Sequence, residues 1–331
     1  MPDKNITHRE KIENCLMGEP SDKTPIALWR HFPVDDQMPE RLASAIINFQ
    51  KAYDFDLVKV TPASSYCLKD WGVMDEWQGN PEGTRQYTQR VINSEEDWYK
   101  LPALNPNEGA LGEQLSCLNL ICEELGSSVP VIQTVFSPLA QAKNLVGSEM
   151  LLVQLRQYPE AVMEGLKTIT ETTKRFIEAA NKTGMAGIFY AVQHANYQYL
   201  SEAEYIQFGH KLDLEILAMT SQNWLNMLHL HGNNIMFKLF TEYPVQVINW
   251  HDRETFPSLS KGKQLFPGVV CGGLQREISM ELGTPEMVEA EAKEAILATE
   301  NKRFILGTGC VLQTITPRAN ILAAIKAARG E

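Results

Sequence analysis

Two histidines and one cysteine in this 331-residue chain have the residue types and spacing to hold a metal ion. His229 and His231 stand two positions apart in the apolar run LHLHGNN (228–234), and Cys310 ends the segment GTGC (307–310). Zinc prefers imidazole nitrogen and thiolate sulfur, and three protein ligands leave a fourth position open for a reacting group. The alternative is that both histidines hydrogen-bond to neighbouring backbone and that Cys310 is an ordinary buried thiol.

The elements that must position these residues are short, nearly continuous apolar runs with helical stretches between them. Such runs are typical of buried parallel strands, and strands that alternate with helices predict βα units. The glycine-rich dinucleotide turn expected in a doubly wound sheet is absent from the sequence. We therefore predict an α/β fold, a single (β/α)8 TIM barrel domain over residues 1–331. Its eight expected strands are 24–29, 56–61, 131–136, 187–192, 227–231, 245–250, 268–273 and 303–308.

Capping signals mark several of the expected helices. Ser201 is followed three residues later by Glu204, which predicts a capping box. Thr284 and Thr316 each precede a proline that suits the first helical position. Residues 158–184 form a long amphipathic pattern that a glycine at its end should terminate.

Residues 63–129 are too long for one loop between the second and third strands. The NPEG turn at 80–83 lies between polar, aromatic-containing flanks, a pattern that indicates an inserted hairpin. We expect this hairpin to cover the barrel mouth as a lid and a helix near 109–126 to follow it. Tyr66, Trp71 and Trp77 belong to this excursion, and they either cover a flat substrate or pack the segment down.

Barrel enzymes carry their catalytic groups at the carboxyl ends of the strands, and polar residues gather there in this sequence. Five of the seven histidines follow or end an expected strand. His229 and His231 share one face of a strand because side chains alternate, and in a barrel that face is the lumen. We expect catalytic roles for His251, Asp252 and His194 as acid/base or supporting groups, metal ligation by His229, His231 and Cys310, and substrate contacts from Arg30, His31, Tyr66, Tyr190, Gln193 and Thr308.

Several of these residues could instead have purely structural roles. Arg30 could bind a substrate carboxylate in two-pronged fashion or simply pair with a neighbouring acid. His251 and Asp252 could form an acid/base pair, support a metal ligand from behind, or belong to an exposed turn.

Composition narrows the classes of partner. A formal net charge of −11 argues against nucleic acid, whose binding draws most of its affinity from clustered Lys and Arg. No run of about 18 apolar residues and no signal-like N-terminus is found, so we expect no membrane partner and a cytoplasmic location. The six cysteines contain no CxxC pair, which predicts free thiols. A small-molecule substrate is expected, and a homodimer is compatible with the sequence.

Several segments together resemble the uroporphyrinogen decarboxylase superfamily. They are FDLVKVTP, GIFYAVQ, HLHGN, VINWHDR, GVVCGGLQ, GTPEMVEAEAKEAI and FILGTGCVLQTITPRANILAAIKAAR, and the resemblance covers essentially the whole chain. This superfamily of (β/α)8 barrels contains the decarboxylases of haem biosynthesis and the zinc-dependent methylcobamide:thiol methyltransferases. The resemblance therefore implies the barrel, and it implies either of two chemistries.

The decarboxylase motifs are incomplete in this chain. LWRHFPVDD matches only one of their two N-terminal arginines, as Arg30; Lys59 lies near the expected aspartate; and Thr308 replaces the histidine of LGHG. The methyltransferase branch carries H-x-C-G-N and G-P-G-C motifs that supply zinc ligands. The resemblance places His229 and Cys310 at two of these ligand positions and His231 where the other cysteine stands, so one thiolate instead of two leaves the centre at net +1.

Three hypotheses follow. The first is a zinc-dependent methyltransferase that moves a methyl group between a corrinoid, or another methyl donor, and a zinc-activated thiol or similar acceptor, with a corrinoid protein as a candidate partner. The second is a metal-free decarboxylase of a pyrrolic or small aromatic acid that Arg30 anchors while His31, His194 or His251 delivers the proton. The third is a non-catalytic barrel that only binds a corrinoid or tetrapyrrole, or that partners a corrinoid protein.

Overall fold

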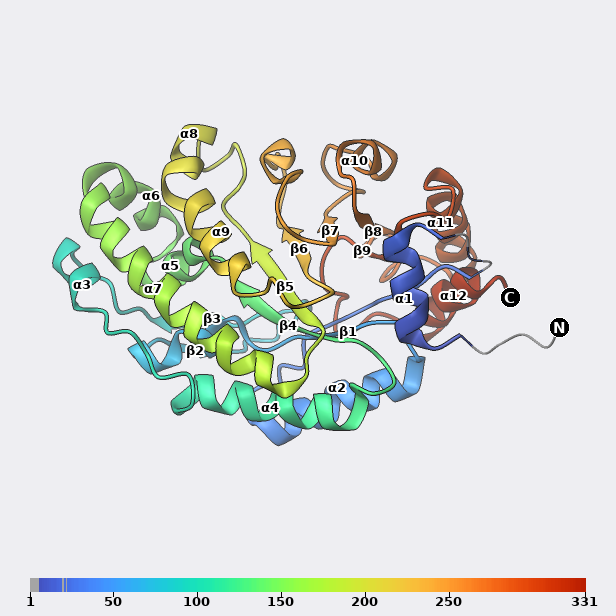
Figure 1. Cartoon of the computed structure of the whole chain (residues 1–331), viewed down its shortest axis with the longest axis horizontal. Helices are drawn as coiled ribbons and strands as arrows, with labels where there is room; N and C mark the ends of the chain where they lie inside the picture. Colours follow the sequence, from blue (N-terminus) through green and yellow to red (C-terminus); the bar gives the residue numbers. More distant parts are fainter. Residues whose placement is uncertain (1–5, 20, 22) are drawn as a thin grey trace.

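The computed structural model describes residues 6–19, 21 and 23–331. Its centre is a curled sheet of seven parallel strands in the order β1-β4-β5-β6-β7-β8-β9, with helices around its outside (Figure 1). This α/β architecture is TIM-barrel-like. The strands are β1 (Val58–Val60), β4 (Val131–Phe136), β5 (Gly187–Val192), β6 (Met227–Leu230), β7 (Val247–Trp250), β8 (Val269–Leu274) and β9 (Phe304–Thr308).

These strands form where the apolar runs of the sequence predict them. Every residue of the seven strands is buried, as expected for parallel strands that are covered on both faces. The register pairs Ala191 with His229 and His229 with Asn249. Since paired residues of parallel strands point to the same face, this register decides which side chains reach the inside of the curl.

The predicted first strand, 24–29, is not a strand of the sheet. This segment is extended between β9 and β1 and makes one isolated parallel bridge, Ile26 to Leu306. Ala27 N–H donates to the Leu306 carbonyl over 3.0 Å, but Ile26 N–H donates to the Asp56 side chain over 2.9 Å instead of to β1. Pro25 has no N–H at all. The Asp56 carboxylate and Pro25 thus prevent the regular backbone hydrogen bonds that would join this segment to β1 as a strand.

Helices cover the outside of the sheet, and short 3-10 or π turns link some of them. The α-helices are α1 (His8–Met17), α2 (Pro39–Tyr53), α3 (Glu95–Lys100), α4 (Gly109–Leu125), α5 (Pro138–Val146), α6 (Ser148–Gln157), α7 (Pro159–Ala180), α8 (Glu202–Tyr205), α9 (Lys211–Ala218), α10 (Leu259–Leu265), α11 (Pro285–Ala298) and α12 (Arg318–Arg329). The 3-10 turns are Ser64–Cys67, Lys69–Trp71, Asn181–Thr183 and Phe237–Phe240, and the π turn is Ile206–His210.

The capping predictions are correct at two helices and wrong by one residue at a third. Ser201 closes a capping box with Glu204, and the Thr284 side chain accepts from the Met287 N–H at the start of α11. The N-cap of α12 is Pro317 rather than Thr316, because the proline itself stays in the extended region and the helix begins at Arg318.

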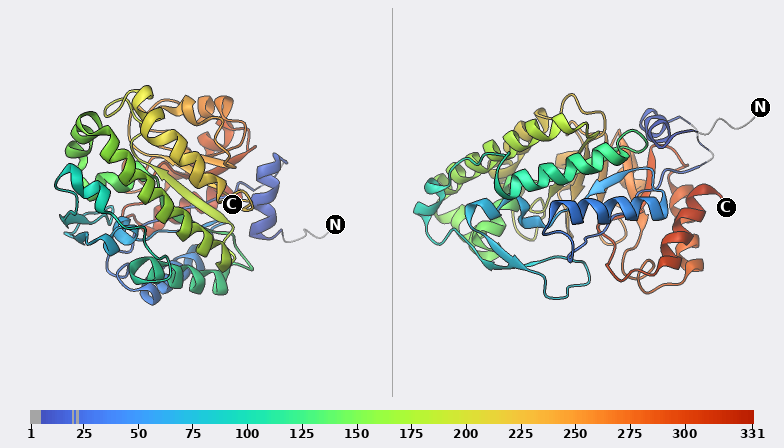
Figure 2. Two further views of the ribbon diagram at one scale, coloured as in Figure 1. Left: turned by 60° about the vertical axis from the view of Figure 1, so that its left-hand side comes forward. Right: turned by 90° about the horizontal axis from the view of Figure 1, so that it is seen from below.

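The segment after β1 contains an antiparallel pair, β2 (Met74–Glu76) and β3 (Gln86–Gln89). The turn between them lies against the segment after β9 and the segment after the extended residues 24–29. Thr314 N–H donates to the Pro81 carbonyl over 2.7 Å, and a Cβ on Gly83 would lie 2.6 Å from the His31 Cβ. The helix predicted near 109–126 is α4, and Figure 2 shows it beside α2 on the outside of the molecule.

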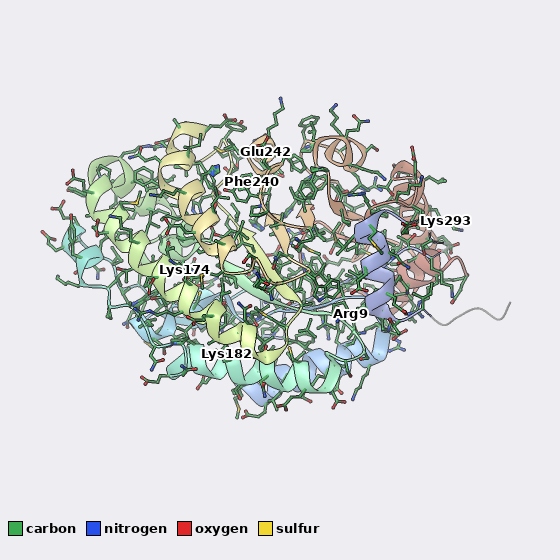
Figure 3. All side chains as sticks on the ribbon, viewed as in Figure 1. Arg9, Lys174, Lys182, Phe240, Glu242 and Lys293 are labelled. Atoms are coloured by element: carbon green, nitrogen blue, oxygen red, sulfur yellow. The ribbon has the colours of Figure 1, made fainter. Side chains whose placement is uncertain are left out.

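Helix α1 lies at the amino ends of two strands. The Cys15 thiol is 3.3 Å from the carbonyl of Phe304, the first residue of β9, and His8 Nδ1 lies 2.8 Å from Asp56 just before β1. Charged side chains such as Lys182 and Lys293 project from the periphery, whereas Phe240 is fully buried (Figure 3). Within the described part of the chain, no helix has the length and apolarity needed to cross a membrane.

Candidate metal centre

Four side chains that can ligate a metal meet at the carboxyl ends of the strands. They are His229 from β6, His231 just after it, His251 just after β7, and Cys310 after β9, and their ligand atoms all lie within 4.8 Å of one another. His231 Nδ1 lies 3.4 Å from His251 Nε2 and 3.8 Å from Cys310 Sγ. Residues 81 positions apart in the chain therefore converge on one point because parallel strands end at the same edge.

The orientation of His229 is set by Asn249. His229 Nδ1 lies 2.7 Å from Asn249 Oδ1, and the Asn249 amide nitrogen donates to the carbonyls of Cys271 and Thr308 over 2.9 and 3.0 Å. With the amide nitrogen committed to two carbonyls, its oxygen must accept from His229. Nδ1 of His229 therefore carries the proton, and the lone pair of Nε2 is free for a metal.

Cys310 reaches the cluster because the residue before it is Gly309, which has no side chain. A Cβ on Gly309 would lie 2.6 Å from the His251 Cα and 2.8 Å from the Trp250 carbonyl oxygen, so only glycine permits this approach. Burial alone would raise the pKa of the Cys310 thiol, but hydrogen bonds with His229, His231 and His251 outweigh burial and hold that pKa well below its usual range. The sulfur is therefore poised as a thiolate, the form that binds metals.

His251 belongs to the cluster itself, which differs from the role expected for it as a separate acid/base group. Its Nε2 faces His231, and its Nδ1 lies 3.1 Å from Glu254. Burial lowers the pKa of His251, but Cys310 and Glu254 raise it to about 9. Strand periodicity could not place this side chain because His251 lies beyond the end of β7.

The donor set suits zinc. Three imidazoles and one thiol are borderline and soft ligands, and carboxylate oxygens, which hard cations such as Mg²⁺ and Ca²⁺ require, are absent from the cluster of described residues. The carboxylate of Glu254 stands behind His251, in the way that acceptors behind metal-bound histidines usually do. Four protein donors would hold the ion, one more than the three ligands that the sequence predicts.

A cavity of about 350 Å³ adjoins the cluster and shares His231 with it. Lys143, Gln193, His194 and Tyr199 help to line it, and Lys143 donates to the Gln193 amide oxygen over 2.8 Å. Burial, with Lys143 and His231 nearby, lowers the pKa of His194 to about 3, and its Nδ1 has no hydrogen-bond partner in the part of the chain that the structure describes. His194 is thus neutral near pH 7, so it can accept a proton or a hydrogen bond but holds no proton to deliver as an acid.

Lys59 is a residue that sequence reasoning did not assign to the site. Its ammonium lies 4.5 Å from the centre of the Phe189 ring and 3.3 Å from the Thr61 hydroxyl, with no carboxylate partner among the described residues. Burial lowers the pKa of Lys59 to about 7. Burial and the Lys59 charge lower the pKa of nearby His31 to about 4. In the sequence, Lys59 could have been noticed as a charged residue within an otherwise apolar run that predicts a buried strand.

Arg30, Tyr66 and Tyr190 do not lie with the cluster. The Arg30 guanidinium lies 5.1 Å from the ring centres of Phe32 and Phe49, and it donates to the Thr314 carbonyl. The Tyr66 hydroxyl donates to the Thr134 carbonyl, and its ring packs against Phe136 and Phe176.

Tyr190 faces outward because its neighbour Ala191 pairs with His229 and so points inward. Its hydroxyl donates to Asp213 Oδ1 over 2.6 Å, and Tyr205 and Tyr243 donate to the other oxygen of that carboxylate. The buried group is a structural junction between β5 and the helices outside it.

Asp252 and Thr308 hold the chain around the cluster. The Asp252 carboxylate accepts from Gly273 N–H over 3.1 Å, which ties the segment after β7 to β8, and burial raises the pKa of Asp252 to about 7. The Thr308 hydroxyl donates to the Cys310 carbonyl, and its own carbonyl accepts from Asn249. Both residues position the turns that carry His251 and Cys310.

The fold and this cluster together define a TIM-barrel-like α/β protein with a candidate metal centre at the carboxyl ends of its strands. The family model described as "Uroporphyrinogen decarboxylase (URO-D)" matches residues 7–330, and the chain belongs to this family.

Two relatives that match the chain are named as methyltransferases. The chain is 23% identical to a methylcobamide:CoM methyltransferase, MtbA, of Methanosarcina acetivorans over 98% of both chains, and 21% identical to the MtbA of Methanosarcina mazei over the same shares. Among solved structures, a methyltransferase from Methanosarcina mazei has a TM-score of 0.85 at 18% identity and 98% coverage of both chains. A B12-independent methionine synthase from Shewanella sp. W3-18-1 has a TM-score of 0.59 at 11% identity and 92% coverage of both chains.

Proposed function

We propose that this protein is a zinc-dependent methyltransferase that moves a methyl group from a corrinoid to a thiol acceptor. The observation that carries the proposal is the convergence of His229, His231, His251 and Cys310, with ligand atoms within 4.8 Å of one another. The methylcobamide:CoM methyltransferases that resemble the chain over 98% of its length support the choice of reaction.

In this proposal, some residues bind the metal and others orient the metal ligands. The three histidines and Cys310 hold the metal, and Asn249 and Glu254 fix the rings of His229 and His251 from behind. Bound zinc lowers the pKa of a coordinated thiol, so that the acceptor is an anion at neutral pH. One thiolate among four ligands leaves the centre at net +1, which lowers both the pKa and the intrinsic nucleophilicity of the acceptor sulfur.

The cavity beside His231 is where we place the acceptor. Lys143 and the neutral His194 offer polar atoms that orient it, and Gln193 holds the Lys143 ammonium in place. The β2–β3 hairpin, whose turn lies against His31 and Thr314, would cover this single-domain barrel as a lid. We expect a corrinoid protein to present the methyl group at the barrel mouth, and a homodimer is our expectation for the assembly.

The contacts of Arg30 give the decarboxylase alternative no support. Arg30, the residue expected to anchor a substrate acid, packs on Phe32 and Phe49 and donates to a backbone carbonyl.

The test is methyl transfer from free methylcobalamin to a panel of small thiols, followed by the change in the visible spectrum of the corrinoid. We expect demethylation that requires zinc, is abolished in Cys310→Ser, and persists in the matched control Cys122→Ser, whose buried thiol lies on α4 near Thr183. A zinc-loaded wild-type protein that demethylates the corrinoid with no thiol of the panel would contradict the proposal.

A further inference from the structure

A chain of charged side chains runs from the β2–β3 hairpin to the candidate metal centre. Glu82, in the turn between β2 and β3, pairs with Arg276, which lies just after β8. Arg276 Nε lies 3.8 Å from Glu254 Oε1, and the other oxygen of Glu254 lies 3.1 Å from His251 Nδ1. The opposite nitrogen of His251 faces His231 at 3.4 Å. Residues 194 positions apart in the chain are joined in this way.

Arg276, in the middle of this chain, is buried, whereas Glu82 and Glu254 are partly exposed. Arg276 is 9% exposed, and its Nε has no hydrogen bond to any described residue. The thiolate of Cys310, Glu82 and Glu254 surround this guanidinium, and the exposed Glu277 lies 3.3 Å from its Nη2. Salt screens charge pairs weakly where they are partly shielded from water. Loss of the Glu82 charge therefore changes how strongly Arg276 attracts Glu254.

We propose that the Glu82–Arg276–Glu254 relay couples docking of the β2–β3 hairpin to the position of His251 and so to the number of protein ligands on the metal. With Glu82 in place, Arg276 holds Glu254 behind His251, and the imidazole stays directed at the cluster. When the hairpin leaves, Arg276 loses one carboxylate partner and draws Glu254 toward itself, which removes the acceptor that orients His251. The site then changes from four protein ligands to three.

A site with four protein ligands has no coordination position for the acceptor. The relay would open one by releasing His251. Catalytic zinc sites keep one position open, whereas four protein ligands are typical of structural sites. A hairpin that controls the fourth ligand would let the metal be held fully when the barrel is closed and exposed to substrate when it opens. This inference rests on the proposed metal centre, and Glu82, Arg276 and Glu254 act as positioning residues.

The variants that test it are Glu82→Gln, Glu254→Gln and the double variant, measured in the full chain without substrate. The readouts are zinc affinity by chelator competition and the visible spectrum of the cobalt-substituted protein, which reports coordination geometry. The matched control is Glu76→Gln, which removes the same charge from exposed β2 away from the relay.

We expect Glu254→Gln to lower zinc affinity by about 10- to 100-fold, the usual effect of removing an acceptor behind a metal-bound histidine. Glu82→Gln should lower it by about two- to thirtyfold, as coupling through a chain of contacts does. Both should alter the cobalt spectrum, whereas Glu76→Gln should alter neither readout. In the Glu254→Gln background, Glu82→Gln should have no further effect.

The two proposals fail differently. A wild-type site that binds zinc, while Glu82→Gln leaves affinity and spectrum unchanged, overturns the relay and leaves the metal centre intact. An effect of Glu82→Gln that persists in full when Glu254 is already glutamine overturns it too, because the coupling then bypasses Glu254. A wild-type protein that binds neither zinc nor cobalt overturns the metal centre and the relay with it.

Discussion

Asn249 and His229 form a hydrogen bond of 2.7 Å that fixes which nitrogen of the histidine can bind a metal. The amide nitrogen of Asn249 donates to the carbonyls of Cys271 within β8 and Thr308 at the end of β9, so the pair ties the centre to the sheet rather than to a loop. A ligand that is oriented by the scaffold loses little conformational entropy when the metal binds.

Asn249→Ala should lower zinc affinity by about 10- to 100-fold, because His229 loses the acceptor that fixes its tautomer and ring orientation. Chelator competition measures this loss, and thermal unfolding of the metal-free variant shows whether the fold survives. An unchanged affinity in a folded variant would mean that His229 does not depend on Asn249.

Lys59→Met should stabilise the metal-free protein at pH 7. A pKa lowered from 10.5 to about 7 means that the fold disfavours the charged ammonium, a penalty of roughly 4 kcal/mol at pH 7. Between pH 7 and 10 the unfolded chain binds the extra proton, so wild-type stability rises with pH and the advantage of the variant shrinks. Urea unfolding across this range measures the trend, and a gap that widens with pH would contradict it.

Tyr190→Phe should destabilise the fold by about 2 kcal/mol and leave zinc affinity unchanged. The variant removes one of three hydroxyls that donate to the buried Asp213 carboxylate, on the face of β5 away from the cluster. Denaturant midpoints and chelator competition check the two halves separately. Weaker zinc binding with unchanged stability would place Tyr190 in the site after all.

Arg30→Met should leave the apparent affinity for the thiol acceptor unchanged, because the guanidinium lies against Phe49 of α2. Initial rates at varied acceptor concentration give the Michaelis constant. A large rise in that constant, restored by Arg30→Lys, would show that Arg30 holds the substrate.

The sequence predicts most of the sheet and three of the four cluster residues for reasons that are local or topological. Buried parallel strands read as continuous apolar runs, and a spacing of two within β6 puts His229 and His231 on one face. The position of Cys310 near the two histidines is predicted because parallel strands end at the same edge of the sheet.

The remainder depends on contacts between distant segments. Residues 24–29 have a strand-like composition, but Pro25 and the Asp56 carboxylate remove their ladder. His251 and Glu82 lie beyond strand ends, where periodicity says nothing of direction. Tyr190 and Lys59 could be assigned only once the register showed which residues of β5 and β1 face inward.

The most direct test of the central claim is the metal content and ligand set of purified wild-type protein. Elemental analysis should give about one zinc per chain, and X-ray absorption at the zinc edge should give one sulfur at about 2.3 Å among nitrogen ligands. His231→Ala and Cys310→Ser should each lose most of the metal. Protein that stays free of zinc after exposure to it, or zinc bound without any sulfur ligand, would contradict the metal centre described here.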